Sequence, residues 1–387
     1  MLTMVPCSGD EMVTRSTSDD RSAESRPCCD TVSAMAAKHG ESIMVQVSGH
    51  EIPVSNPDKV FFSAAPSAAA SADGTGRGAT KADLIRYYLA MEPAVMRAMR
   101  DRPVLLQRFP NGAEGSSFFQ KRIPDGAPEW LTTTVVTTPN GTTSNALVIA
   151  DLGHLIWAVN LGCLGFHTWP MHAADPEHCD ELRIDLDPGP GTTFAMAQET
   201  AVEVHRLFDD VGIRSYIKTS GNRGLHVYVR LLRRWDSVAV RSAAVAVARE
   251  LARRRPDLIT DSWWKQERGE RIFVDFNQNA PHKTVFAPWS VRARPHAPVS
   301  CGFAWDELAG IDPNALTIAT VPARIAAAGD PWADMDLHPQ SLEPLLDMVR
   351  ADTDAGLPDA PWPPVYPKMP GEPPRVAPSR AKKRASN

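Results

Sequence analysis

The sequence predicts an α+β protein with one large globular core, and three observations support this fold class. The chain has 387 residues, of which 43% are hydrophobic and 22% charged, as is typical of folded proteins. Apolar residues alternate with polar ones in segments such as 182–187, which predicts strands. Segments with helical spacing of apolar residues, such as 193–210, lie between them and predict helices.

The composition divides the chain into a folded domain and two flanking segments. Residues 1–42 lack periodic apolar spacing and are rich in Ser, Asp and Glu, which predicts a disordered leader. The folded domain is expected over 43–350, with a flexible insertion at 63–79 where Ala, Ser and Gly predominate. Residues 351–387 are rich in proline and end in a basic cluster, which predicts a disordered tail.

Local patterns predict the elements of the folded domain. Thr80 is expected to cap one helix and Gly212 to end another, because these residue types satisfy helix ends. An Asn-Gly turn predicts a hairpin within 135–150. The expected strands are 43–48, 103–108, 182–187, 216–219, 225–231, 272–276 and 288–294, and the expected helices are 80–100, 151–164, 193–210 and 236–255.

Three aspartates are candidate metal ligands. Side chains alternate along a strand, so Asp185 and Asp187 point to the same side, away from the apolar residues between them. Asp275 lies in an otherwise apolar strand, where an unpaired carboxylate would be costly. Neighbouring carboxylates repel each other, and oxygen ligands suit magnesium or manganese, so the pattern predicts a metal site. The alternative is that the first two acids merely end a strand above solvent.

A glycine-rich turn follows the acidic strand and its helix. Gly221 and Gly224 allow backbone amides to approach a ligand closely, while Ser220 and Arg223 add a hydroxyl and a guanidinium. The turn is therefore a candidate site for phosphate oxygens, and His226 is expected on the face that bears the acids. A simple hairpin is the alternative, because a strand rather than a helix follows the turn.

The charge distribution favours a polyanionic partner. The net charge is -5, but residues 214–294 contain 17 Lys and Arg against 7 Asp and Glu. This local excess can hold a nucleic acid. Phe118 and Phe119 are consecutive residues near Lys121, so both cannot face the core from a simple strand. An exposed ring there could stack on a nucleobase, although this pattern by itself favours ordinary core packing.

Cysteine usage and hydropathy indicate a reducing compartment. Six cysteines are scattered along the chain, so reduced thiols and a cytoplasmic location are expected. No apolar run approaches the roughly 20 residues of a membrane helix, and a signal peptide is not expected. A cluster of potential zinc ligands precedes the acidic strand, namely Cys163, His167, His172, His178 and Cys179. Because this cluster contains no C-x2-C pair, simple packing of these side chains is favoured over a zinc site.

Six short motifs, taken in order, are more specific than any one of them. They are Asn56-Pro-Asp-Lys59, Phe118-Phe-Gln-Lys121, Asp185-Leu-Asp-Pro-Gly189, Lys218-Thr-Ser-Gly-x-x-Gly-Leu-His226, Val274-Asp-Phe276 and Ser290-Val-Arg-Ala-Arg294. Over about 42–308 their order resembles the polymerase domain of bacterial ligase D, in the archaeo-eukaryotic primase superfamily. No nuclease or ligase sequence follows, and the motif His282-Lys-Thr-Val-Phe286 comes after Asn277-Gln-Asn279. For these two reasons the chain is most similar to the stand-alone actinobacterial primase-polymerases associated with ligase C.

The resemblance implies an α/β two-layer fold, in which an RRM-like primase-polymerase catalytic core has two facing β-sheets flanked by helices. It implies that Asp185, Asp187 and Asp275 bind two Mn²⁺ or Mg²⁺ ions beside a nucleoside triphosphate. The residues that the resemblance implies for nucleotide binding are Ser220, Gly221, Arg223, Gly224, His226, Lys265, Arg271, Arg292, His167 and Asn56. Those that it implies for DNA binding are Phe118, Phe119 and Lys121, and those for binding a downstream 5′-phosphate are Lys59 and Lys81.

The function predicted from this resemblance is a template-dependent DNA/RNA nucleotidyltransferase that fills short gaps or extends ends in DNA repair. Non-homologous end joining and excision repair are the expected settings, with ribonucleotides favoured over deoxynucleotides. The protein is expected to be a monomer associated with the nucleoid, with gapped or 5′-phosphorylated DNA and an ATP-dependent DNA ligase as partners. Three alternatives stay open: a de novo primase, a metal-dependent phosphoesterase or nuclease, and a DNA-binding module without catalysis.

Overall fold

The computed structural model describes residues 42–64, 78–366 and 368. The predicted leader, apart from Ser42, and all of the predicted insertion except its first and last two residues lie outside the described residues. The strands are β1 Ile43–Val47, β2 His50–Val54, β3 Val60–Phe62, β4 Ala79–Thr80, β5 Pro103–Arg108, β6 Phe118–Gln120, β7 Thr133–Thr137, β8 Thr143–Val148, β9 Cys163–Thr168, β10 Cys179–Pro188, β11 Tyr216–Thr219, β12 Leu225–Trp235, β13 Ile259–Thr260, β14 Ile272–Val274, β15 Val285–Phe286 and β16 Gly302–Phe303. The α-helices are α1 Lys81–Ala90, α2 Glu92–Met99, α3 Leu152–Asn160, α4 Phe194–Asp210, α5 Ser237–Arg254, α6 Val321–Ala328 and α7 Glu343–Asp354, and the 3-10 helices are η2 Lys265–Glu267, η3 Phe276–Asn279, η4 Trp305–Gly310, η5 Pro313–Ala315 and η6 Met335–Leu337.

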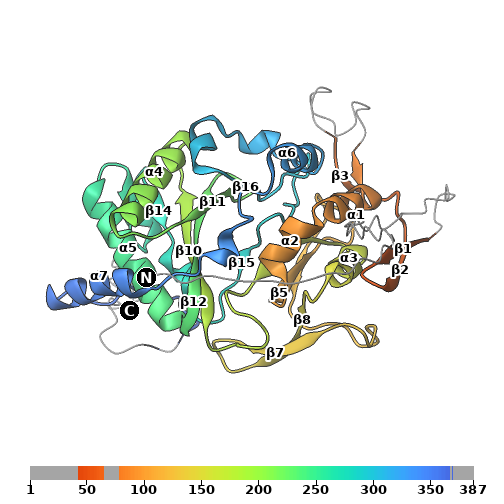
Figure 1. Ribbon diagram of the computed structural model, residues 1–387, viewed down its shortest axis with the longest axis horizontal. Coiled ribbons are helices and arrows are strands. Elements are labelled where there is room, and N and C mark those ends of the chain that lie inside the picture. The colour runs from red at the N-terminus through yellow and green to blue at the C-terminus, as the bar shows by residue number, and fades with distance from the viewer. Residues whose placement is uncertain (1–41, 65–77, 367, 369–387) are drawn as a thin grey trace, which may run out of the picture.

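Two large sheets form the centre of the molecule (Figure 1). The first has the order β13-β14-β10-β12-β11-β16, and the second has the order β15-β9-β5-β8-β7 with β6 paired to β5. Helices α4 and α5 pack on the first sheet, and α1 and α3 pack against the second, so helices lie at both sides of the pair. This arrangement confirms the predicted α+β fold with two facing sheets flanked by helices.

Helix ends follow the predicted capping chemistry, with two differences. The Thr80 hydroxyl accepts the backbone N–H of Asp83 and caps α1, as predicted. The single helix expected over 80–100 is instead divided at Met91, because α2 begins there with Pro93 in its first turn. The helix expected over 151–164 ends at Asn160, and β9 follows where helix was expected. Gly162, with φ 81°, makes the turn between them.

Two predicted strands also differ from the structure, and one strand was not predicted. The strand expected over 272–276 stops at Val274, because the carboxylate of Asp275 accepts the Asn277 backbone N–H over 3.1 Å and starts η3. The segment 288–294 is not a strand, since Trp289 has φ 65° and only Val291 forms a β-bridge. The expected loop around Phe118 and Phe119 contains the short edge strand β6.

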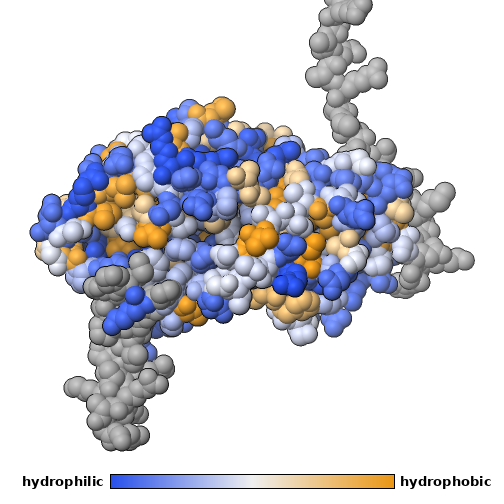
Figure 2. Space-filling view, turned by 90° about the horizontal axis from the view of Figure 1, so that it is seen from below, coloured by the Kyte–Doolittle hydropathy of each residue, from blue (hydrophilic) through white to orange (hydrophobic). Residues whose placement is uncertain are grey.

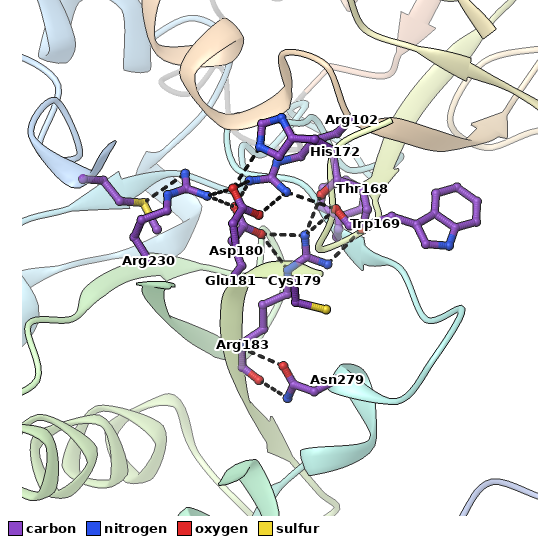
Figure 3. A network of polar contacts seen from close by, with 12 residues as sticks. Arg102, Thr168, Trp169, His172, Cys179, Asp180, Glu181, Arg183, Arg230 and Asn279 are labelled. Atoms are coloured by element: carbon purple, nitrogen blue, oxygen red, sulfur yellow. Dashed lines mark hydrogen bonds and ion pairs between the residues drawn. The ribbon is translucent and has the colours of Figure 1, made fainter. Parts of the chain in front are cut away.

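A buried charge network joins the two sheets at the start of β10 (Figure 3). Asp180 forms ion pairs with Arg102 on β5 over 2.7 Å and with Arg230 on β12 over 2.8 Å. Glu181 accepts from Arg183 over 2.6 Å, and Arg183 also donates to a β9 carbonyl over 2.9 Å. Each of these buried carboxylates therefore has cationic partners, and the network fixes one sheet against the other.

The chain remains packed beyond the predicted end of the folded domain. Helix α7 extends to Asp354, and both Trp362 and Tyr366 are buried. The prediction of disorder from residue 351 is therefore wrong for 351–366, because two large aromatic side chains bury apolar surface there. Except for Lys368, the remainder of the predicted tail lies outside the described residues.

The surface of the molecule mixes hydrophilic and hydrophobic residues. On the face shown in Figure 2, hydrophobic residues form small separate patches among hydrophilic ones. In the part of the chain that the structure describes, no helix is both long and apolar enough to span a bilayer.

Candidate active site

The three predicted metal-binding aspartates lie at one end of the first sheet. Asp185 and Asp187 are near the end of β10, and Asp275 directly follows β14, which pairs with β10. The backbone N–H of Asp275 donates to the carbonyl of Asp185 over 2.9 Å. Strand pairing therefore brings together acids that lie far apart in the sequence.

Two of these carboxyl groups are strongly affected by their surroundings. Burial, followed by repulsion from Asp275 and Asp187, raises the pKa of Asp185 to about 8, and Lys218 and Arg292 oppose this rise. Burial also raises the pKa of Asp275. A nearby cation favours the charged form of such a group. The electrostatics of the three acids therefore fit a bound cation.

The three aspartates have donor atoms that suit a hard divalent cation, but their side chains are not arranged around one in this structure. Among the described residues, these three included, no group of three or more His, Cys, Asp or Glu side chains is arranged to hold a metal ion. The aspartates are neighbours, with the Asp187 side chain 59% exposed and the Asp185 side chain 19% exposed. Carboxylate oxygens suit Mg²⁺ and Mn²⁺, so Asp185, Asp187 and Asp275 are the residues that would hold such ions.

His226 lies beside Asp185, as the strand alternation predicts. Register pairs the two residues, and the His226 Nε2 is 3.3 Å from the Asp185 carboxylate. Burial, and then the charges of Lys218 and Arg292, hold the pKa of His226 well below its ordinary value. Its Nδ1 is buried and has no hydrogen-bond partner in the described part of the chain. A buried polar atom without a partner is uncommon in folded proteins, which marks His226 as a candidate functional residue.

The glycine-rich turn is held closely against the acidic strand. The Ser220 hydroxyl accepts the backbone N–H groups of Asn222 over 3.2 Å and Gly224 over 3.1 Å. A Cβ at Gly224 would lie 2.5 Å from the carbonyl oxygen of Leu186, so only glycine fits. Gly221 has φ 71°, which glycine adopts readily. The turn therefore depends on both glycines.

The acids and this turn line one cavity of about 140 Å³. Seven of the predicted site residues contribute to its wall, namely Asp185, Asp187, Ser220, Arg223, Gly224, His226 and Arg292, whereas the predicted residues Asp275 and Gly221 do not line it. The Arg292 Nε donates to the carbonyl of Ser220 over 2.9 Å, which fixes this cation beside the turn. Acidic and basic groups thus face each other across a space in which a phosphate could lie.

A larger cavity, of about 870 Å³, lies at the opposite end of β10. Its wall includes Arg102, Asp180 and Arg230, whose charges are already paired within the buried network. The smaller cavity instead combines two of the predicted metal ligands with the glycine-rich turn, so it is the candidate active site.

Two residues predicted to contact phosphate, Lys265 and Arg271, lie outside the smaller cavity that Asp185 and Asp187 line. Arg268 lies closer to these acids. Lys265 is exposed on η2, while the Arg271 guanidinium donates to the carbonyls of Arg268 and Glu267 over 2.9 Å each. Arg268 has a terminal nitrogen 4.0 Å from the Asp187 carboxylate. Arg268 was not predicted as a site residue, because the segment 263–271 has no regular alternation that would indicate which way its side chains point.

Lys218 is a second basic residue that the sequence analysis did not place in the site. It is completely buried on β11, where its Nζ donates to the Ser300 hydroxyl over 2.6 Å and to the Phe286 carbonyl over 3.2 Å. Burial, and then Arg292, hold its pKa well below the ordinary lysine value. A lysine within the otherwise uncharged β11 segment Tyr-Ile-Lys-Thr was the available signal.

A row of rings connects the cavity with the exposed phenylalanines. His167 packs edge-on against Phe119 at 5.5 Å and against Phe286 at 5.1 Å between ring centroids. The Arg292 guanidinium lies 3.5 Å from the Phe286 ring centre. Burial, and then Arg292, lower the pKa of His167 to about 3. Phe118 and its neighbour are 47% and 58% exposed, so the core packing that their sequence pattern favours is wrong for both rings.

The predicted 5′-phosphate lysines form a separate group with Asn56. The insertion separates Lys59 from Lys81 in the sequence, yet the Lys81 backbone N–H donates to the Lys59 carbonyl over 2.9 Å. Lys81 is buried, and its Nζ donates to the carbonyl of Ser55 over 2.5 Å and to that of Asn160 over 3.1 Å. Burial, and then Lys59, lower the pKa of Lys81 to about 8. The exposed Asn56 belongs with these lysines and does not line the cavity of the acids.

The five residues considered for zinc lie in different environments. The Cys163 thiol contacts the Gly165 carbonyl, and Cys179 contacts the Ser237 hydroxyl over 3.2 Å. His172 and His178 each approach a carboxylate, on Asp180 and Asp175 respectively, and His167 belongs to the row of rings. These side chains have separate partners, in agreement with the favoured packing interpretation.

Comparisons with known proteins point to one family. A family model described as the LigD primase-polymerase domain matches residues 80–332. LigD of Mycolicibacterium smegmatis, a multifunctional non-homologous end joining protein, is 32% identical over 319 residues, which are 82% of this chain and 40% of that protein. The chain belongs to the LigD primase-polymerase domain family. That domain is a nucleotidyltransferase, which confirms the enzyme class predicted from the sequence.

Other LigD proteins and a solved structure agree with this family. The bifunctional non-homologous end joining protein LigD of Bacillus subtilis is 32% identical over 69% of this chain and 43% of its own length. The polymerase domain of Mycobacterium tuberculosis ligase D, solved in complex with DNA, matches with a TM-score of 0.66 and 31% identity, over 75% of this chain and 99% of that one. The chain spans less than half the length of the M. smegmatis and B. subtilis LigD proteins. Special similarity to the ligase C-associated proteins stays a prediction.

Proposed function

We propose that this protein is a template-dependent nucleotidyltransferase that fills short gaps or extends ends during DNA repair. The observation that carries the proposal is the cavity in which Asp185 and Asp187 face the Ser220 turn and Arg292. Paired acids that can hold a divalent cation, opposite amides and cations that can hold phosphate oxygens, are what nucleotidyl transfer requires. A nuclease would need the acids but not the phosphate-binding turn.

Each group in the cavity has a role in positioning the substrates. Two Mn²⁺ or Mg²⁺ ions, held by Asp185, Asp187 and Asp275, would supply positive charge for in-line attack on the α-phosphate and for the departing pyrophosphate. Arg223 and Arg292 line the cavity and would bind triphosphate oxygens as bidentate donors. His226 lines the cavity beside Asp185 and would contact the bound nucleotide. No side chain is needed as a general base, since position and charge account for the chemistry.

Phe118 and Phe119 are proposed to stack on template bases. Replacing both by alanine is expected to weaken binding of a primer-template about 10-fold or more, because base stacking contributes roughly 1–3 kcal/mol per base. The free energy of unfolding should change little, since both rings are exposed. Fluorescence anisotropy with a labelled duplex measures this. Val135→Ala, another exposed residue on the same sheet, is the matched control, and wild-type affinity in the double variant would contradict the proposed role.

Lys59 and Lys81 are proposed to recognise a downstream 5′-phosphate, with the exposed Lys59 making the outer contact. The pKa of Lys81 is about 8, so this side chain is charged below pH 8 and neutral above it when no phosphate is bound. The ratio of extension rates on 5′-phosphorylated and unphosphorylated gaps is therefore expected to fall as the pH rises from 7 to 9. Lys81→Met should remove that pH dependence. A ratio that is constant with pH in the wild type would exclude a role for the Lys81 charge.

One assay tests the proposed function as a whole. The purified protein is incubated with a primed duplex containing a short 5′-phosphorylated gap, with Mn²⁺ or Mg²⁺, and with ribo- or deoxynucleotides in turn. Template-directed extension, faster with ribonucleotides, is the expected result. Dinucleotide synthesis without a primer would favour a de novo primase, and strand cleavage would favour a nuclease. DNA binding with neither reaction would indicate a module without catalysis.

A DNA ligase is proposed to seal the product. The names of the relatives refer to non-homologous end joining, and their matched segments are parts of longer proteins. Adding an ATP-dependent ligase to the gap-filling reaction is expected to give a continuous strand, whereas ligase alone should leave the gap open.

A further inference from the structure

The loop that carries Asp275 is held by a segment from the other end of the chain. The Asp275 carboxylate accepts the backbone N–H of Asn277 over 3.1 Å and the side-chain amide of Gln278 over 2.9 Å. The Asn279 side chain also exchanges two hydrogen bonds with the backbone of Arg183 on β10, of 2.9 and 2.7 Å. The position of Asp275 therefore depends on η3, the 3-10 helix that follows it.

Asn277 connects this helix to a buried cation. Its side-chain oxygen accepts from the Nε of Arg241 over 2.7 Å, and its side-chain N–H donates to the carbonyl of Pro361 over 3.0 Å. Arg241, on α5, is completely buried. The side chain of Asn277 is itself 2% exposed, so neither of these groups can exchange its partners for water.

Residues 359–366, which we call the strap, supply the remaining partners of that cation. Asp359 forms an ion pair with Arg241 over 3.1 Å, and the carbonyl of Ala360 accepts from the same guanidinium over 2.9 Å. The ring of Trp362 lies 3.9 Å from the guanidinium carbon, and its Nε1 donates to Asp359 over 2.7 Å. The strap therefore encloses the cation on its charged, polar and aromatic sides.

A second contact ties the strap directly to the segment after η3. The Tyr366 hydroxyl donates to the carbonyl of Pro281, and Trp362 and Tyr366 pack with Ala280 in one buried cluster. The strap follows the part of the chain that matches the family model, because that match ends at residue 332. The strap is thus outside the matched domain yet adjoins the loop of its third acid.

We propose that the strap positions Asp275 for metal binding through Arg241 and Asn277, which act as positioning residues. This inference rests on the proposed function, because it assigns Asp275 to a divalent cation. Groups that orient metal ligands from behind typically change metal affinity about 10- to 100-fold when they are removed. The polymerase site therefore extends to a segment in which the sequence pattern indicates only a proline-rich tail.

The test is the affinity of the full-length protein for Mn²⁺, measured by electron paramagnetic resonance of the free ion. Trp362→Ala is expected to bind Mn²⁺ about 10-fold more weakly than the wild type. Extension should recover at high Mn²⁺, so the half-saturating metal concentration rises more than the maximal rate falls. Trp362→Phe, which keeps a ring over Arg241 but loses the bond to Asp359, should bind Mn²⁺ with intermediate affinity.

Asp352→Asn is the matched control. It removes ion pairs of 3.4 and 3.1 Å that Asp352 on α7 forms with Arg249 and Arg253 on α5. Helix α5 also carries Arg241, but these ion pairs lie away from η3. This variant should lose stability and keep wild-type Mn²⁺ affinity. A folded Trp362→Ala protein with wild-type Mn²⁺ affinity would overturn the proposal.

Two further outcomes are distinguishable. If Trp362→Ala does not fold, Asp359→Asn decides, since it removes the ion pair and leaves the ring in place; wild-type Mn²⁺ affinity in that variant would also overturn the proposal. If the wild type binds Mn²⁺ but extends no primer, the proposed function fails. The comparison of Mn²⁺ affinities among the variants still tests the strap in that case.

Discussion

Replacing Asp185 and Asp187 together by alanine is expected to reduce primer extension by about 10³-fold or more, because the charge that would hold the metal ions is removed. Asp185 lies in the cavity beside the phosphate-binding turn and 3.3 Å from His226. Asp187 shares its face of β10 and is more exposed. Single-turnover extension of a labelled primer, with saturating nucleotide and metal, measures the loss.

The same double variant should remain folded and bind DNA. Removing two repelling carboxyl groups, one of them buried, leaves the rest of the sheet intact, so the free energy of unfolding should not fall. Loss of extension with retained DNA binding would exclude the non-catalytic alternative. Full extension by the variant would exclude the polymerase assignment.

Replacing Arg102 by methionine is expected to destabilise the protein by about 3–5 kcal/mol, because it leaves buried carboxylates without a principal partner. The Arg102 guanidinium lies 2.7 Å from Asp180 and 3.0 Å from Glu181, and all three side chains are buried. Urea unfolding followed by circular dichroism measures the change. Arg206→Met, which removes an exposed 2.7 Å ion pair with Glu203 on α4, should have no detectable effect.

A double-variant cycle separates the ion pair from simple loss of volume. Arg102→Met combined with Glu181→Gln should be less destabilised than the sum of the two single variants, because the second change removes one of the unpaired charges. Additive effects would show that Arg102 and Glu181 are not coupled, and a loss equal to that of Arg206→Met would show that the network at the start of β10 contributes little to stability.

Regular periodicity explains which elements were predictable. The alternation in 182–187, the apolar spacing in 193–210 and the cap of α1 at Thr80 indicated strands and helices near the right positions, because these patterns are local. Strands β6 and β9 were less predictable, since β6 has only three residues and both depend on neighbouring strands for pairing. The end of the strand at Asp275 depended on a single carboxylate contact.

The sequence by itself determined the family and the α+β class, and it predicted the three acids and the glycine-rich turn as the site, because these depend on motif order and local alternation. Only the tertiary structure decided which basic groups accompany them. Lys218 and Arg268 lie close to the acids, while Lys265 and Asn56 lie outside the cavity. It also showed that residues 359–366 adjoin the loop of Asp275. Such contacts join residues far apart in the chain, and no local pattern records them.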